Sequence, residues 1–358
     1  MQTPVPSLDF SPAEPVAPLF ALHYVSSQDA RTLLANNAPV LGVIGYGTAR
    51  PDFLPATCAF APAPLLPQDG VPKFEIWTAI SPCSPLRVGP VLGAVSDDLA
   101  FGAITLDQAE NASLEDIVEQ AYLKIFDFMD AAGFAAPVRF WNYLTAITAD
   151  DRGLERYRRF NIGRQKAFSA RLRQALPPAA SGVGGFYGNS LIYFLAARQE
   201  ATPIENPRQI SAYQYPKIYG PQSPSFSRAS AYSQNAMQAL FISGTASIVG
   251  HETRHAGDLP GQIAETIANL RALIGAAGQP GHPAPSPETG NWALKIYLQN
   301  PDFRETVEPA IDAMFGAGTE RLYLHGEICR PGLLLEIEAF HSAVDFNAVP
   351  ITLQSAAL

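Results

Sequence analysis

The chain has 358 residues, 47% of them hydrophobic, so it can bury a sizeable core as one large domain or two of ordinary size. Its net charge of −9 argues against an extended nucleic-acid surface, and an anionic ligand would need a local cluster of arginines. No stretch approaches the roughly 20 uninterrupted apolar residues of a membrane span, and the N-terminus lacks a signal-peptide pattern, so we expect a cytoplasmic protein without membrane contact.

The predicted elements occur as two copies of one pattern. Residues 1–96 contain strand-like runs among many prolines, and we expect them to extend the first sheet. Each copy then runs strand, helix, strand, helix and paired strands: 99–107, 113–133, 138–145, 153–168 and 178–198 in the first, and 239–250, 259–278, 292–299, 301–316 and 322–340 in the second. This order predicts an α+β fold in which two helices cover one face of each sheet.

Local signals support the helices and suggest where the halves divide. Ser113, followed by Asp116, is a capping-box pattern, and apolar residues recur at helical spacing before Gly275. We divide the chain into an N-terminal half, 1–229, and a C-terminal domain, 230–358. The first half ends in a connecting loop, 206–229, that is rich in Pro, Ser and Tyr. A bare linker is one interpretation, although linkers are normally poor in aromatic residues.

Residues 152–173 hold eight basic side chains against a single acid. A charge run of this kind is usually a solvated helix face. Arg164 differs from its neighbours because it follows Asn-Ile-Gly, where a glycine can bring the backbone close to a ligand. We therefore single out Arg164 as a candidate binding residue.

The segment LYLHGEICRPGLLLEIEAF, residues 322–340, predicts two strands joined at a Pro-Gly turn. With this pair at the centre of the turn, Glu327 would lie opposite Glu336, and both would share a polar face with Cys329. A bulge at the turn would shift the pairing by one residue. The polar face is either a solvated edge or the lining of a reaction chamber.

Three further patterns could suggest a zinc site, a phosphate loop or a disulfide framework, but the surrounding sequence argues against each. HETRH, residues 251–255, matches the HExxH pattern of zinc proteases, but Gly257 and Pro260 deny its histidines a shared helix face, so we expect no metal site. SGVGG, residues 181–185, lacks the strand-to-helix context and the lysine of a phosphate loop, and close packing at a strand end explains it better. Three scattered cysteines fit neither a disulfide framework nor a CxxC metal site.

Several motifs carry a likeness to known families. FISGTAS at 241–247, Gly257-Asp258, the pattern from Gln262 to Leu270 and EIEA at 336–339 resemble the Rid superfamily, the YjgF-like proteins with a chorismate-mutase-like fold. Five longer motifs between about 97 and 341 are FWNYL, ERYRRFNIGR, ENPRQISAYQYPKIYGPQSPSFSRA, FISGTASIVGHET, and GEIC with LLLEIEA. Through them the chain resembles the chorismatases, duplicated relatives of the Rid fold that include chorismate hydrolases and 3-hydroxybenzoate synthases.

The resemblance implies two tandem Rid-like layers, the small molecule chorismate as substrate, and no cofactor. It implies that Glu336 is the catalytic glutamate, and that the cysteine at Cys329 goes with the branch that forms 3-hydroxybenzoate. Rid proteins form sites between subunits, so the duplication would let a monomer supply both sides. Phe194 lies near the first copy's counterpart of Glu336, so we expect one active site.

The chemistry of chorismate fits these residues. It has two carboxylates, which suit bidentate guanidinium groups, and an acid-labile enolpyruvyl ether, which needs a proton donor. The candidate substrate-binding residues are Arg164, Arg228, Tyr157, Tyr213 and Tyr215. A glutamate buried in an apolar segment is harder to ionise, so Glu336 could act as general acid, with Cys329 assisting ring opening or proton transfer. Two alternatives stay open: hydrolysis to the dihydroxycyclohexadienoate, and a Rid-like ligand-binding protein without catalysis.

Overall fold

The computed structural model describes residues 20–36, 38–106, 112–134, 136–172, 176–234, 237–278, 284–288 and 291–343. Two seven-stranded sheets contain the repeated halves. The first has the order β21 (Glu327–Ile328), β12 (Ala179–Gly185), β9 (Ala136–Thr145), β13 (Leu191–Ala197), β8 (Leu99–Thr105), β7 (Val91–Val95) and β6 (Ser84–Val88). The second has the order β4 (Leu66–Pro67), β20 (Glu320–His325), β19 (Asn291–Leu298), β22 (Leu335–Ser342), β16 (Met237–Thr245), β15 (Ala229–Gln234) and β14 (Thr202–Ile204).

The N-terminal segment forms a third sheet with the same internal order. Its strands are β1 (Phe20–Ser26), β5 (Lys73–Ala79), β2 (Val40–Tyr46) and β3 (Phe60–Ala63), which correspond in order and direction to β8, β13, β9 and β12. The second and third strand of each copy pair in parallel: β2 with β3, β9 with β12, and β19 with β20. The expectation that residues 1–96 extend the first sheet therefore holds for β6 and β7, whereas β4 joins the second sheet and β1, β2, β3 and β5 build a truncated third copy. Residues 1–19 lie outside the described residues.

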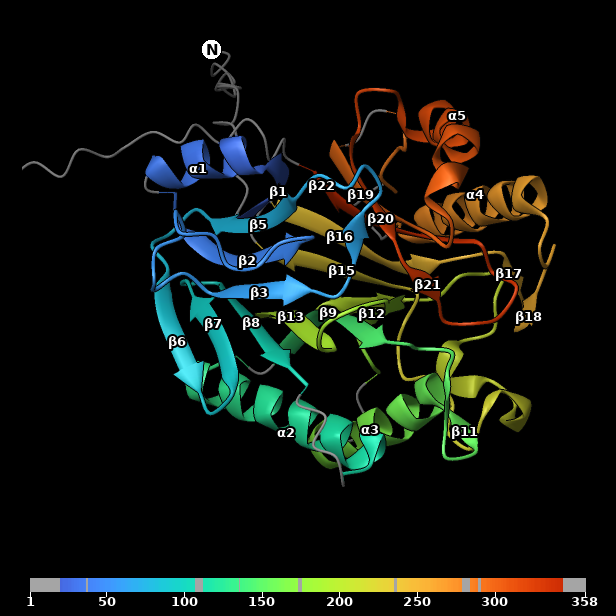
Figure 1. Ribbon diagram of the computed structural model, residues 1–358, viewed down its shortest axis with the longest axis horizontal. Helices are drawn as coiled ribbons and strands as arrows, with labels where there is room; N and C mark the ends of the chain where they lie inside the picture. The colour runs from blue at the N-terminus through green and yellow to red at the C-terminus, as the bar shows by residue number, and fades with distance from the viewer. Residues whose placement is uncertain are drawn as a thin grey trace, which may run out of the picture.

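Five helices cover the outer faces of these sheets within the described residues: α1 (Ser27–Ala35), α2 (Leu114–Ala132), α3 (Arg156–Arg171), α4 (Leu259–Ala276) and α5 (Arg304–Phe315). Figure 1 shows α1, the α2–α3 pair and the α4–α5 pair on three different outer sides, with the strands between them. The predicted cap is confirmed, since Ser113 Oγ accepts the Asp116 N–H at 3.2 Å. Gly275 lies inside α4 and does not end it.

Helix α3 begins three residues later than predicted. Residues 150–155 form a short hairpin, β10 (Asp150–Asp151) with β11 (Leu154–Glu155). Arg152 and Gly153 turn it with positive φ angles of 56° and 84°, which a helix does not allow. The hairpin therefore uses the residues from which the helix was expected to start.

The strand pairing predicted for residues 322–340 is wrong. Strand β20 pairs with β19 and β4, β21 pairs with β12, and β22 lies between β16 and β19. Glu327 is therefore opposite Gly184, and Glu336 is opposite Tyr297. The strand pairing predicted for residues 178–198 is also wrong, because β9 lies between β12 and β13 in the sheet. In the first copy β12 and β13 are consecutive in sequence but are not neighbours in the sheet. In the second copy β19 separates β20 from β22, and β21, which lies between them in sequence, joins the first sheet.

The inner faces of the three sheets meet in one core. Tyr46, Tyr143 and Tyr297 hold the same position on β2, β9 and β19, and their hydroxyls lie 3.1 Å (Tyr46 to Tyr143) and 2.9 Å (Tyr143 to Tyr297) apart. Beside them the buried Lys295 Nζ is 2.9 Å from Glu75 Oε2 and 2.7 Å from Glu338 Oε1. This polar centre joins residues of all three sheets. Among the described helices, none is long and apolar enough to cross a membrane.

Candidate active site

A cavity of about 230 Å³ lies between the first and second copies. The first copy contributes α3 and β12, and the second contributes β16, β22 and the segment that follows β21. The connecting loop covers it through Gln209, Tyr215, Tyr219, Pro224, Phe226 and Arg228. Of the seven predicted site residues, six line this cavity: Glu336, Cys329, Arg164, Tyr157, Tyr215 and Arg228.

Glu336 enters the cavity from β22, where alternation along the strand puts it on the inner face with Glu338. Gly244 on β16 faces it so closely that a Cβ there would come within 1.8 Å of Glu336 Oε1. Burial raises the pKa of Glu336 to about 8, and the charge of Glu338 adds to this, while Arg139 and Arg228 act in the opposite direction. The carboxyl is therefore protonated at neutral pH.

Cys329 is a partly buried free thiol two residues after Glu327. Burial raises its pKa to about 12, and the nearby Glu336 raises it further, while Arg330 lowers it. The side chain is a neutral thiol that can donate a weak hydrogen bond, and it is a poor thiolate nucleophile.

Arg164 and Arg228 bring two buried guanidinium groups to the cavity, with exposed fractions of 2% and 4%. Arg164 lies over the ring of Phe160 and donates to Asn161 Oδ1 at 3.1 Å. Arg228 donates to the Ile210 carbonyl at 2.9 Å. The Nε of each is buried without a hydrogen-bond partner, and neither forms an ion pair with a carboxylate of the described residues. The Nε of each cation is therefore available to an anionic ligand, although Arg228 also lies near the Glu205 carboxyl, whose pKa is raised by burial and lowered by this guanidinium.

Of the three predicted tyrosines, two line the cavity and one does not. Tyr215 accepts a hydrogen bond from Arg228 Nη2 at 2.7 Å, and the Tyr157 ring lies against the backbone of Gly182 on β12. Tyr213 does not line the cavity: it lies within the 3₁₀ turn η1 (Ala212–Gln214), two residues before Tyr215. Successive residues in such a turn rotate by about a third of a turn each, so the two rings point in different directions.

Comparison with known proteins shows the family of the chain. Residues 75–196 match the family described as Chorismatase FkbO/Hyg5-like, N-terminal. A chorismatase of Streptomyces hygroscopicus is 32% identical over 319 residues, which cover 85% of this chain and 90% of the relative. The chain belongs to the chorismatase family.

Two further relatives of this chorismatase-family protein are similar over most of their length. A 3-hydroxybenzoate synthase of Streptomyces hygroscopicus is 36% identical over 227 residues, 61% of this chain and 67% of that protein. A chorismatase crystal structure matches with a TM-score of 0.82 at 28% identity, covering 91% of this chain and 99% of that one. The expected family and the α+β fold are thus confirmed.

Three of the cavity residues of this family member that were not predicted make notable contacts. Arg330 stacks on Tyr219, with its guanidinium carbon 4.1 Å from the ring centre, and donates to the His251 carbonyl at 2.7 Å. Tyr219 in turn is 3.1 Å from His251 Nδ1. Ser181, from the glycine-rich SGVGG segment, lies on β12 beside Gly244. The sequence signals were adjacency to Cys329 for Arg330, a place in the Tyr-rich connecting loop for Tyr219, and a motif assigned to packing for Ser181.

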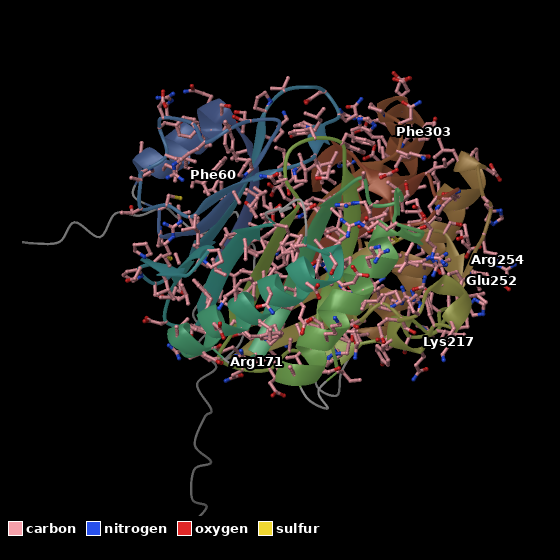
Figure 2. The ribbon with its side chains drawn as sticks, turned by 60° about the horizontal axis from the view of Figure 1, so that its bottom comes forward. Phe60, Arg171, Lys217, Glu252, Arg254 and Phe303 are labelled. Carbon is pink, nitrogen blue, oxygen red and sulfur yellow. The ribbon has the colours of Figure 1, made fainter. Side chains whose placement is uncertain are left out.

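The HETRH residues of this protein lie outside any helix, as expected. His251 contacts Tyr219, whereas His255 Nε2 is 3.6 Å from Glu265 on α4, so the two histidines have different partners. Between them, Glu252 and Arg254 pair with each other at 3.0 Å. Figure 2 shows both at one edge of the molecule, near Lys217 of the connecting loop. No group of three His, Cys, Asp or Glu side chains in the described residues is arranged to hold a metal.

The counterpart of Glu336 in the first copy is Leu191, not a residue near Phe194. Leu191 lies opposite Tyr143 on β9, as Glu336 lies opposite Tyr297 on β19. Phe194 faces the helix layer and packs on Phe128 of α2, with ring centres 5.8 Å apart. The two copies were matched by the order of their elements, without the strand register, so the expected counterpart lay three residues from the true one. Side chains three residues apart on a strand point to opposite faces of the sheet.

Proposed function

We propose that the protein converts chorismate to 3-hydroxybenzoate and pyruvate. One observation carries the proposal: two buried guanidinium groups, neither in an ion pair with a carboxylate of the described residues, share a cavity with a carboxyl whose pKa burial raises to about 8. Chorismate has the complementary groups, two carboxylates and an enol ether that acid cleaves. Guanidinium binds carboxylate in a planar, two-point geometry, so Arg164 and Arg228 would fix the substrate with its ether near Glu336.

In the first step, Glu336 transfers its proton to the methylene carbon of the enolpyruvyl group. The methylene becomes a methyl group, and positive charge develops on the carbon bonded to the ether oxygen. The Glu336 carboxylate formed in this step stabilises that charge at short range. A general acid works best when its pKa lies near the working pH, and a pKa of about 8 meets this condition.

In the second step, the oxygen of the neighbouring ring hydroxyl bonds to the ring carbon that carries the ether. The carbon–oxygen bond of the ether breaks, its electron pair completes the carbonyl group of pyruvate, and the hydroxyl proton passes to a base, for which the Glu336 carboxylate is available. The remaining epoxide opens, loses a ring proton and becomes 3-hydroxybenzoate. No water enters the overall equation, and no oxidant or reductant is required.

Cys329 supports this product over the hydrolytic one. As a neutral thiol that lines the same cavity as Glu336, it can donate a proton or hydrogen bond to the opening epoxide without itself attacking. The competing candidate is hydrolysis, in which water attacks and the dihydroxycyclohexadienoate is released. Relatives described as chorismatase and as 3-hydroxybenzoate synthase match at 32% and 36% identity, so their names favour neither product.

The test follows pyruvate and 3-hydroxybenzoate in one reaction with chorismate. The parent protein should release the two in equal amounts. Cys329→Ala should continue to release pyruvate while its aromatic product falls and the dihydroxycyclohexadienoate appears, because protonation by Glu336 precedes the branch. Cys58→Ala, which removes another partly buried thiol outside the cavity, is the matched control and should leave the ratio unchanged. A parent protein that forms only the dihydroxycyclohexadienoate would establish hydrolysis, and one that releases no pyruvate would remove chorismate as substrate.

A further inference from the structure

We propose that Glu338 is a positioning residue for Glu336: its fixed negative charge and its link through Ser181 to Gly244 keep the neighbouring carboxyl protonated and directed into the cavity. The inference rests on the proposed function, in which Glu336 donates the proton. Its basis is the arrangement of the two carboxyls on β22, which share a strand face but have opposite surroundings.

Glu338 is buried and its two oxygens contact four donors. Arg139 Nη2 and Ser181 Oγ lie 2.9 and 2.5 Å from Oε2, and Trp141 Nε1 and Lys295 Nζ each lie 2.7 Å from Oε1. Charged and neutral donors on both oxygens stabilise the ionised form. Although burial acts in the opposite direction, Lys295 and Arg139 hold the pKa of Glu338 below its ordinary range.

Glu336 is equally buried but differently surrounded. No Lys, Arg or His of the described residues forms an ion pair with it. Burial and the ionised Glu338, two residues away on the same face, both disfavour a second negative charge. Two carboxyls whose surroundings separate their pKa values in this way can take different roles, one as fixed charge and one as acid.

A chain of contacts also couples the positions of the two side chains. Ser181 Oγ donates to Glu338 and accepts the Gly244 backbone N–H at 2.9 Å. Gly244 in turn lies directly against the Glu336 carboxyl, where any added Cβ would collide with Oε1. The link therefore runs from Glu338 on β22 through Ser181 on β12 to the β16 backbone and back to Glu336.

Other titratable or charged side chains lie around Glu336 and Glu338, and each has to be considered in a pH experiment. They are Arg139 and Tyr143 on β9, Lys295 and Tyr297 on β19, Glu75 on β5, Tyr24 on β1, Tyr157 and Arg164 on α3, Glu155 on β11, Arg228 before β15, and Cys329 and Arg330 after β21. Burial first, then neighbouring carboxylates, raises the pKa of Tyr24 and Tyr297. These phenols therefore stay neutral across the working range. Burial raises the pKa of Glu320 to about 7, but Glu320 does not line the cavity, so we assign the limb near pH 8 to Glu336 and test this with Glu320→Gln.

The experiment measures kcat/KM for chorismate against pH. In the parent protein we expect a plateau at low pH and a fall above about pH 8, as Glu336 loses its proton. Glu338→Gln removes the charge and keeps the shape, so this limb should move about one unit toward lower pH. Glu338→Asp keeps the charge and should leave the limb in place while lowering kcat, because its shorter side chain loosens the contact with Ser181.

Two further variants test the proposal independently of Glu338→Gln. Ser181→Ala preserves both charges and removes the link to Gly244, so kcat should fall about tenfold at unchanged KM, and it carries the test if Glu338→Gln does not fold. Glu320→Gln alters a partly buried carboxyl, which accepts the Tyr24 N–H outside the cavity, and it should leave the limb unmoved. An unshifted limb in folded Glu338→Gln, or an unchanged kcat in Ser181→Ala, would overturn the proposal. Absence of chorismate turnover in the parent protein would instead overturn the proposed function.

Discussion

In the proposed function, Glu336, Arg164 and Arg228 determine which ligand the cavity can bind and which reaction it can catalyse. Each is buried, and within the described residues none of them forms an ion pair. Burial raises the pKa of Glu336 to about 8, and neither arginine forms an ion pair with a carboxylate of the described residues. Burying a cation in this way costs stability unless a ligand anion completes it. The role of each side chain can therefore be tested by its own substitution.

Glu336→Gln should fold normally and lose at least the ~10²–10⁴-fold in kcat typical of general acid catalysis. The amide keeps the shape but has no proton to give to the enol ether. Turnover can be followed as pyruvate release. The same substitution should abolish the limb at about pH 8 in any residual activity, since the titrating group is gone. Activity within a few-fold of the parent would remove Glu336 from the mechanism.

Arg164→Lys and Arg228→Lys should each raise KM for chorismate by roughly tenfold or more, although both retain the positive charge. A lysine ammonium cannot reproduce the planar two-point contact with a carboxylate. Arg152→Lys is the control, because Arg152 lies on the same basic segment with its side chain 65% exposed. Equal KM values for all three variants would return Arg164 and Arg228 to a structural role.

Within the two repeated halves, the order of the long helices and strands was predictable from the sequence because each carries its own local signal. Ser113 caps α2 through Asp116, and apolar spacing marks α4. The neighbours of each strand were not predictable: β19 separates β20 from β22, and the parallel pair β19–β20 has no local signature. A Pro-Gly pair between two strand-like runs suggested a hairpin, but the turn connects strands that are not adjacent.

The site was predictable only in part for the same reason. Glu336, Cys329 and Arg164 stood out as polar groups in unusual surroundings, and the resemblance gave the first two a role. Ser181 and Arg330 have no such pattern, because their importance comes from contacts with β16 and the connecting loop across the interface of the copies. The third, truncated copy also escaped the sequence, since its helix α1 and four strands lie among prolines.

Helix α3 carries Arg164 and Tyr157, and it depends on a close crossing with α2 at Gly163. A Cβ at this glycine would come within 2.2 Å of the Glu115 carbonyl oxygen, so Gly163→Ala must push the helices apart. We expect a loss of ~1–3 kcal/mol in the free energy of unfolding and a higher KM for chorismate. Urea denaturation and steady-state kinetics measure the two effects.

Gly275→Ala is the matched control for this prediction. Gly275 is also helical, but nothing lies within 4 Å of an added Cβ there. Alanine has a higher helix propensity by up to ~1 kcal/mol, so this variant should be as stable as the parent or more stable. A destabilisation equal to that of Gly163→Ala would mean that the close crossing is not the cause.

The molecule as a whole arranges three copies of one unit around a polar centre, and its cavity opens between only two of them. At the position of Glu336, the first copy has Leu191 and the truncated copy has Lys73, which pairs with Asp69 at 3.2 Å. Only the second copy has a carboxyl there. Because the copies cover one another within a single chain, a monomer stays our prediction for the protein in solution, to be measured by analytical ultracentrifugation.

The last prediction concerns Lys295, which joins the sheets at that centre. Its ammonium contacts Glu75 of the truncated copy and Glu338 of the second, and Nζ is 2.7 Å from Tyr193 Oη of the first. Burial lowers the pKa of Lys295, but the two carboxylates more than offset this and raise it. Lys295→Met leaves both carboxylates buried without this cation, so we expect a loss of about 3–5 kcal/mol in the free energy of unfolding.

Urea denaturation followed by tryptophan fluorescence and far-UV circular dichroism tests both the size of this loss and its reach. The chain has three tryptophans, and Trp77, Trp141 and Trp292 lie one in each sheet. If the centre couples the copies, the two signals should give one coincident transition in the parent protein. Lys217→Met, on the exposed connecting loop, should change stability by less than about 0.5 kcal/mol. The stabilisation by Glu338, whose pKa is depressed, should be complete above its ordinary value of 4.5 and disappear as the pH falls below it. Separate transitions for the two signals, or a Lys295→Met variant as stable as Lys217→Met, would show that the copies fold independently of this ion pair.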